Sequence, residues 1–257
     1  ESSVECRDVR LMEPWDGVIN VLAALGVGGF AVHVLLPVRR NRAPSLLEIR
    51  FGALALLLSL FLAMRGLFWL SGFDAFLGIS FIAVSFVPLG ILLAVEGFLR
   101  RHAPLPLKLF PLVGGALCLI ATQAQGTPNA LLFSLFLASF QILGLLLPFG
   151  WAFLRDRTQL SRRENRRVDG MITLTLVGLP FIATDFTDLL SGLPVRLGAI
   201  AILMFAYATV HTARFPQQNP VFSWRAFNLI LTTLIAAGAF IWLTELWGWP
   251  AYIKLTA

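Results

Sequence analysis

Charged residues are scarce in this sequence, and their scarcity limits the class of protein. Only 13% of the 257 residues are Asp, Glu, Lys or Arg, whereas 58% are hydrophobic and the mean hydropathy is +0.81. Soluble chains are about a quarter charged, and a chain of this length must cover itself with polar surface when water surrounds it. The composition therefore predicts an all-α polytopic integral membrane protein, because an open strand in lipid would leave its backbone unpaired.

Reactive side chains are also few. The two cysteines, Cys6 and Cys118, have no metal-ligand spacing, and the three histidines form no H-x-x-x-H or H-E-x-x-H pair. The two lysines, Lys108 and Lys254, lie at the ends of apolar segments, so a Schiff-base lysine in mid-membrane is absent. The sequence has no G-x-S-x-G motif and no phosphate-binding loop. We therefore predict no metal site and no bound cofactor, and nominate no catalytic residue.

Long apolar segments fill most of the chain. A bilayer core of about 30 Å needs about 20 apolar residues as a helix, and about eight segments meet this requirement. The chain then divides into an outer-side polar arm (1–16), a seven-helix membrane bundle (17–215), and a last part (216–257) with a cytoplasmic loop, the eighth span and a short outer tail. The predicted spans are 17–38, 51–71, 75–98, 109–124, 130–153, 170–190, 196–213 and 226–247.

The basic residues predict how these spans are oriented. Fifteen of the 20 Lys and Arg residues fall in alternate connections, and nine of the 14 acidic residues fall on the opposite side. Basic residues favour the cytoplasmic side in short loops, so we predict that both termini lie outside, as in a multi-pass protein of the bacterial inner membrane. The basic excess is thus a topology signal, and no nucleic-acid partner is expected. The basic connections are 39–50, 99–108, 154–169 and 214–225.

Six ionisable residues are predicted near the outer side of the bundle, where each is costly unless it is paired or reaches water: Arg65, Asp74, Asp185, Asp188, Arg196 and Glu245. Arg65 lies near the outer end of the second span, and Glu245 near that of the last. Asp185 and Asp188 end the sixth span and, three residues apart, share one helix face. We predict an Arg65–Asp185 ion pair, with Asp188 as the substitute. Two interpretations stay open: a polar pocket that binds a ligand or partner, and a salt bridge that holds the bundle together.

Two further charged features lie on the predicted cytoplasmic side. Glu96 and Arg100 are spaced as an i,i+4 pair at a helix end. The connection 154–169 carries a basic cluster that we expect to contact anionic lipid headgroups, at about 1 kcal/mol per residue. Ordinary topology determination explains the same cluster without a partner. Its members are Arg162, Arg163, Arg166 and Arg167.

Two stretches carry a resemblance to a known family. Residues 89–106, LGILLAVEGFLRRHAPLP, form a predicted helix that ends in Phe-Leu-Arg-Arg before a Pro-containing loop. Residues 162–215 join an Arg-rich start, a span that ends near Leu-Leu-Ser-Gly-Leu-Pro, and a span that ends with Arg-Phe. This pattern resembles the seven-transmembrane N-terminal sensor region of bacterial membrane histidine kinases and related signalling proteins. The resemblance implies a non-catalytic input module with its N-terminus outside.

The chain departs from that family pattern after Phe215, where an eighth apolar segment stands in place of a kinase domain. We therefore expect a non-enzymatic sensor-like or scaffold module that contacts other membrane proteins, membrane lipids, or a ligand in an outer-side pocket. The alternative is an accessory structural subunit of a large respiratory, photosynthetic or envelope complex. A transporter or an intramembrane enzyme is less favoured, since neither repeated halves nor paired broken helices are apparent.

Overall fold

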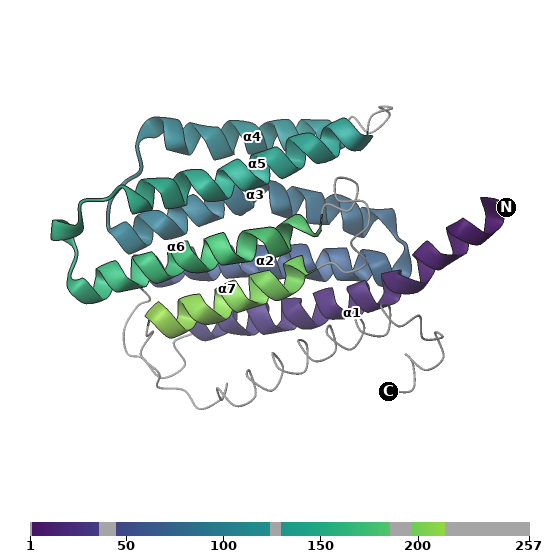
Figure 1. Ribbon diagram of the computed structural model, residues 1–257, viewed down its shortest axis with the longest axis horizontal. Coiled ribbons are helices and arrows are strands. Elements are labelled where there is room, and N and C mark those ends of the chain that lie inside the picture. Colours follow the sequence, from purple (N-terminus) through teal and green to yellow (C-terminus); the bar gives the residue numbers. More distant parts are fainter. Residues whose placement is uncertain (1, 36–44, 124–129, 186–196, 214–257) are drawn as a thin grey trace.

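The computed structural model describes residues 2–35, 45–123, 130–185 and 197–213, which form a bundle of helices lying side by side (Figure 1). These residues contain no strand. Four helical segments are long and apolar enough to cross a membrane: Asp16–Leu35, Leu46–Ser71, Asp74–Leu99 and Leu135–Phe153. The prediction of an all-helical chain with helices able to span a membrane is confirmed for four of the eight predicted spans. The predicted eighth span, 226–247, lies outside the described residues.

The helices follow the predicted spans closely in most places. In chain order they are α1 (Ser2–Leu35), α2 (Leu46–Ser71), α3 (Asp74–Leu99), α4 (Leu105–Gln123), α5 (Ala130–Phe153), a 3₁₀ helix η1 (Arg157–Gln159), α6 (Arg162–Ala183) and α7 (Gly198–Ala213). The segment expected to be a separate polar arm, 1–16, is helical from Ser2 and continuous with the first span in α1.

The sixth helix differs most from its prediction. We predicted a loop at 154–169 and a span at 170–190, but α6 begins at Arg162 and ends at Ala183. A capping box sets the start: the Glu164 backbone N–H donates to the Ser161 hydroxyl at 3.2 Å, and the Ser161 N–H donates to the Glu164 carboxylate at 2.9 Å. The basic segment from Arg162 onward is therefore helix. Asp185 follows α6 in a turn, so its predicted place inside the sixth helix is wrong, while Asp188 lies outside the described residues.

Small residues let α1 and α2 approach closely. A Cβ added at Gly66 on α2 would lie 2.8 Å from the backbone oxygen of Gly17 on α1. About two helical turns further along, the Ser59 hydroxyl donates to the Ala24 carbonyl at 2.9 Å, and a Cβ at Gly28 would meet that same hydroxyl. Glycine here serves helix packing, as expected in membrane helices.

The bundle has two ends that matter for the site. The Arg65 end holds the α2–α3 turn at Gly72 and the turn that follows α6. The Glu96 end holds the α3–α4 turn and the connection between α5 and α6 (Figure 1).

Candidate functional site

A cavity of about 370 Å³ lies between α2, α3, α5, α6 and α7, and it reaches the Arg65 end of the bundle. Most of its wall is apolar, with aromatic side chains such as Phe68, Trp69 and Phe181 near Arg65. The cavity lies alongside α2 from Leu58 to Trp69. Ligand sites in proteins are concave and mainly apolar, with a few convergent polar groups. The polar side chains in the wall, apart from Trp69, are Arg65, Ser80, Gln141, Thr175 and Asp185.

Three of these polar side chains, those of Ser80, Thr175 and Gln141, donate to backbone carbonyls. The Ser80 hydroxyl donates to the Leu77 carbonyl at 2.7 Å, and the Thr175 hydroxyl donates to the Met171 carbonyl at 2.9 Å. Both bonds run to the preceding helical turn of the same helix. The inner wall therefore offers an apolar ligand a surface whose hydroxyls already have acceptors.

The Gln141 side chain bonds to a different helix from its own. Its side-chain amide, on α5, donates to the Val84 carbonyl on α3 at 2.8 Å. In a regular helix that carbonyl would accept from residue 88, but Pro88 has no N–H to donate. Gln141 is buried, so the bond satisfies a carbonyl that water does not serve and fixes α5 against the proline turn of α3.

The predicted ion pair between Arg65 and Asp185 is confirmed. The Arg65 Nη1 lies 2.9 Å from the Asp185 Oδ2, and Nη2 donates to the Asp185 carbonyl at 3.4 Å. The guanidinium also lies over the ring of Phe61, 5.7 Å from its centroid. The two side chains are 17% and 12% exposed, so the pair is neither a solvated surface bridge nor fully enclosed.

Asp185 also holds the start of α7. Its Oδ1 accepts from the backbone N–H of Gly198 at 3.1 Å, and the neighbouring Thr184 hydroxyl accepts from Leu197 N–H at 2.8 Å. Both acceptors serve backbone donors that the first turn of a helix leaves without partners, and a carboxylate is favoured there by the helix dipole. Asp185 thus joins the end of α6 to α2 through Arg65 and to α7 through Gly198.

Some of the other predicted site residues lie in the described part of the chain and some do not. Asp188 and Glu245 lie outside the described residues. Arg162 and Arg166 are exposed on the first two turns of α6, whereas the side chains of Arg163 and Arg167 are not described.

The predicted Glu96–Arg100 pair is wrong. Glu96 is buried, with a side chain only 1% exposed, and it pairs with Lys108 at 2.9 Å and Arg50 at 3.4 Å. It also accepts the Ala103 backbone N–H at 2.7 Å. Arg100 instead ends α3 in the left-handed region and turns its side chain to Glu164 at 2.9 Å. Helical spacing alone missed the three-element cluster around Glu96, because its cations come from α2 and α4.

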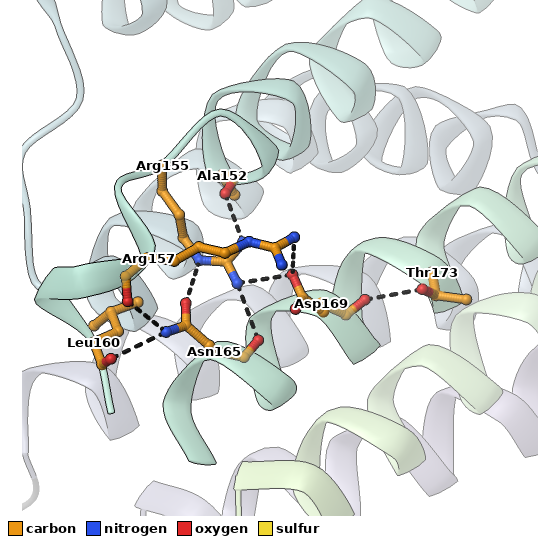
Figure 2. A network of polar contacts seen from close by, with 7 residues as sticks. All are labelled: Ala152, Arg155, Arg157, Leu160, Asn165, Asp169 and Thr173. Atoms are coloured by element: carbon orange, nitrogen blue, oxygen red, sulfur yellow. Dashed lines mark hydrogen bonds and ion pairs between the residues drawn. The ribbon is translucent and has the colours of Figure 1, made fainter. Parts of the chain in front are cut away.

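A second polar network at the Glu96 end joins α5 to α6 (Figure 2). Arg155, with 5% of its side chain exposed, donates through Nη2 to the Asp169 carboxylate at 2.7 Å and to the Asn165 carbonyl at 3.0 Å. Its Nε donates to the Asn165 side chain at 3.0 Å, and its Nη1 to the Ala152 carbonyl at 2.8 Å. The Asn165 amide in turn donates to the carbonyls of Arg157 and Leu160. The network fixes the short connection that the basic cluster follows.

The connection also has its own cap. The Thr158 backbone N–H donates to Asp156 at 3.0 Å, as does the Thr158 hydroxyl at 2.7 Å. These hydrogen bonds lower the pKa of the exposed Asp156 carboxyl, and the bond from the Thr158 backbone contributes most.

Chemically, the cavity can accommodate an apolar molecule and present one ion pair to its polar end. The described part of the chain holds no group of three or more His, Cys, Asp or Glu side chains placed to bind a metal ion. Comparison of the sequence with protein-family profiles and with curated proteins, and of the fold with solved structures, gives no significant match.

Proposed function

We propose that this protein is a non-enzymatic, sensor-like membrane module that binds an apolar ligand in the cavity between its helices. The observation that carries the proposal is the position of the Arg65–Asp185 pair in the wall of a 370 Å³ apolar cavity. A salt bridge that served only to hold helices together would need no such space beside it.

The same pair offers a route from ligand to signal. Asp185 connects α2, the end of α6 and the start of α7, so a ligand beside Arg65 touches three helices at once. A ligand that favours one arrangement of these helices shifts the population toward it. Neighbouring membrane proteins would sense that shift at the surface of the bundle.

The proposed setting is the bacterial inner membrane, with eight spans and both termini outside. The exposed Arg162 and Arg166 would then face the cytoplasmic leaflet and contact anionic lipid headgroups. Thiol labelling tests this orientation cleanly, because Cys118 is buried and Cys6 is the other cysteine of the chain. A membrane-impermeant reagent should label Cys6 in intact cells; labelling that requires permeable cells would reverse the orientation.

Ligand binding is tested by filling the cavity. Gly178 on α6 lines the cavity, and a Cβ added there meets nothing within 4 Å. Gly170, two turns earlier on the same helix, also has open space but is not part of the wall. Gly178→Leu should therefore occupy the cavity, while Gly170→Leu is its matched control.

The measurement is quenching of Trp69 fluorescence by bromodecane in lipid nanodiscs, since a bromine in the cavity would lie close to Trp69. A Trp69→Phe variant gives the share of the signal that belongs to this residue. We expect the Trp69 share to be strongly quenched in the wild type and in Gly170→Leu, and much less in Gly178→Leu. Equal quenching in the two leucine variants would show that the bromine acts from the surrounding lipid, and would remove the basis of the proposal.

A second candidate function, an accessory subunit of a larger membrane complex, draws on α4. This helix exposes an apolar face that a partner subunit or lipid would cover: Leu105, Leu109, Leu112, Val113, Leu117 and Ile120. Native mass spectrometry after extraction in mild detergent separates the two functions, because an accessory subunit would retain a stoichiometric protein partner.

A further inference from the structure

We infer that the ligand is an uncharged amphiphile: a single apolar chain that carries one hydroxyl or carbonyl oxygen, with that oxygen accepting a hydrogen bond from Arg65. This inference rests on the proposed binding function and names the chemical class of its ligand. Three features of the cavity carry it.

The first feature is the length and chemistry of the wall. The stretch of α2 from Leu58 to Trp69 covers about 16 Å at the rise of an α-helix, and the cavity lies along it. Away from Arg65, the hydroxyls of Ser80 and Thr175 and the amide of Gln141 donate to backbone carbonyls. The hydroxyl donors of Ser80 and Thr175 are thus already in use, and the rest of the wall away from Arg65 is mainly apolar. The inner part of the cavity therefore selects an apolar chain.

The second feature is the donor capacity of Arg65. A guanidinium carries five N–H donors, and within the described part of the chain Arg65 uses two of them, both toward Asp185. Arg65 belongs to the cavity wall and is 17% exposed. Its remaining N–H groups can serve an acceptor oxygen on the ligand without loss of the ion pair.

The third feature is the charge balance of the pair. The carboxylate of Asp185 already neutralises the guanidinium at 2.9 Å. An anionic head bound to Arg65 would lie within a few ångströms of that carboxylate, and a cationic head bound to Asp185 would lie equally close to Arg65. Like charges at such distances repel strongly where the effective dielectric constant is low. The site therefore favours a neutral head over either ion.

Competition against bromodecane tests the head group while the quenching probe stays the same. Decanol, decyl phosphate and decane have the same chain and differ in the head. We expect decanol to restore Trp69 fluorescence at a concentration in the bilayer about tenfold below that of decyl phosphate, and also below that of decane. This comparison uses the wild-type protein and needs no variant to fold.

Asp185→Asn then reverses the charge balance, because it leaves Arg65 without its counter-charge. In this variant decyl phosphate should become the better competitor, and thermal unfolding shows whether the variant remains folded. Decyl phosphate competing as well as decanol in the wild type would overturn the inference while leaving the cavity as a binding site. Failure of all three competitors, together with equal quenching in Gly178→Leu and Gly170→Leu, would instead overturn the proposed function itself.

Discussion

The side-chain amide of Gln141 donates to the carbonyl of Val84, 2.8 Å away on a neighbouring helix. The acceptor is the carbonyl that Pro88 leaves without an intrahelical donor. A buried carbonyl without a partner costs about 1–3 kcal/mol, so α5 supplies what the α3 backbone lacks. The bond lies in the wall of the cavity and fixes the distance between two of its helices.

Gln141→Leu should lower the free energy of unfolding by about 1–3 kcal/mol, because it removes the donor and leaves the Val84 carbonyl in an apolar setting. Unfolding by SDS titration in mixed micelles measures the change. In a Pro88→Ala background, where residue 88 regains its N–H, the same substitution should cost clearly less. An identical cost in both backgrounds would show that Gln141 does not replace the missing proline donor.

Glu96→Gln should destabilise the protein by about 2 kcal/mol, because Lys108 and Arg50, whose side chains are 34% and 17% exposed, lose the buried carboxylate with which they pair. The matched control is Glu164→Gln. Glu164 pairs with Arg100, whose side chain is 76% exposed, and Gln can still complete the capping box with Ser161. The control should cost under about 1 kcal/mol. SDS titration of the two variants side by side measures both changes in the free energy of unfolding. Similar changes would mean that the Glu96 charge contributes little to stability.

Arg155→Lys should loosen the connection between α5 and α6. Lysine keeps the charge but cannot reproduce the forked contacts to Asn165, Asp169 and the Ala152 carbonyl. We expect chymotrypsin to cleave after Leu154 or Leu160 several-fold faster than in the wild type. Arg166→Lys, at an exposed position on α6, should leave the cleavage rate unchanged. Equal rates in the two variants would contradict a structural role for the Arg155 network.

Gly198→Ala should weaken the link between α2 and α7, because an added Cβ would overlap the Asp185 carboxylate. Forcing an extra methyl into a packed site costs about 1–3 kcal/mol. Gly178→Ala is the control: its Cβ meets open space, and alanine is favoured over glycine inside a helix by roughly 0.5–1 kcal/mol. SDS titration should therefore show opposite signs for the two substitutions. A stabilising Gly198→Ala would mean that Asp185 moves aside without loss.

Much of the architecture could be predicted from the sequence, because lipid imposes simple rules. The segment 130–153 was predicted to the residue, and α2, α3 and α7 lie within a few residues of their predicted spans. The start of α6 was missed because hydropathy marks where a helix enters apolar surroundings, whereas Ser161 and Glu164 mark where its hydrogen bonds begin. Arg65 and Asp185 were paired correctly because the sequence places both charges at the same depth. An unpaired charge is costly in apolar surroundings, so two opposite charges at one depth are expected to pair.

By itself, the sequence determined that the described chain is helical, with helices apolar enough to cross a membrane, and it paired Arg65 with Asp185. The tertiary structure alone decided the partners that helical spacing cannot reveal. Glu96 pairs with Lys108 and Arg50 in place of the predicted Arg100. Gln141 on α5 donates to the Val84 carbonyl on α3. A pocket beside Arg65 was one of the two predicted alternatives, but it was predicted as polar and its wall is mainly apolar. Hydropathy and spacing describe each helix along its own axis, whereas these contacts depend on how helices are ordered and rotated around one another, and only packing sets that arrangement.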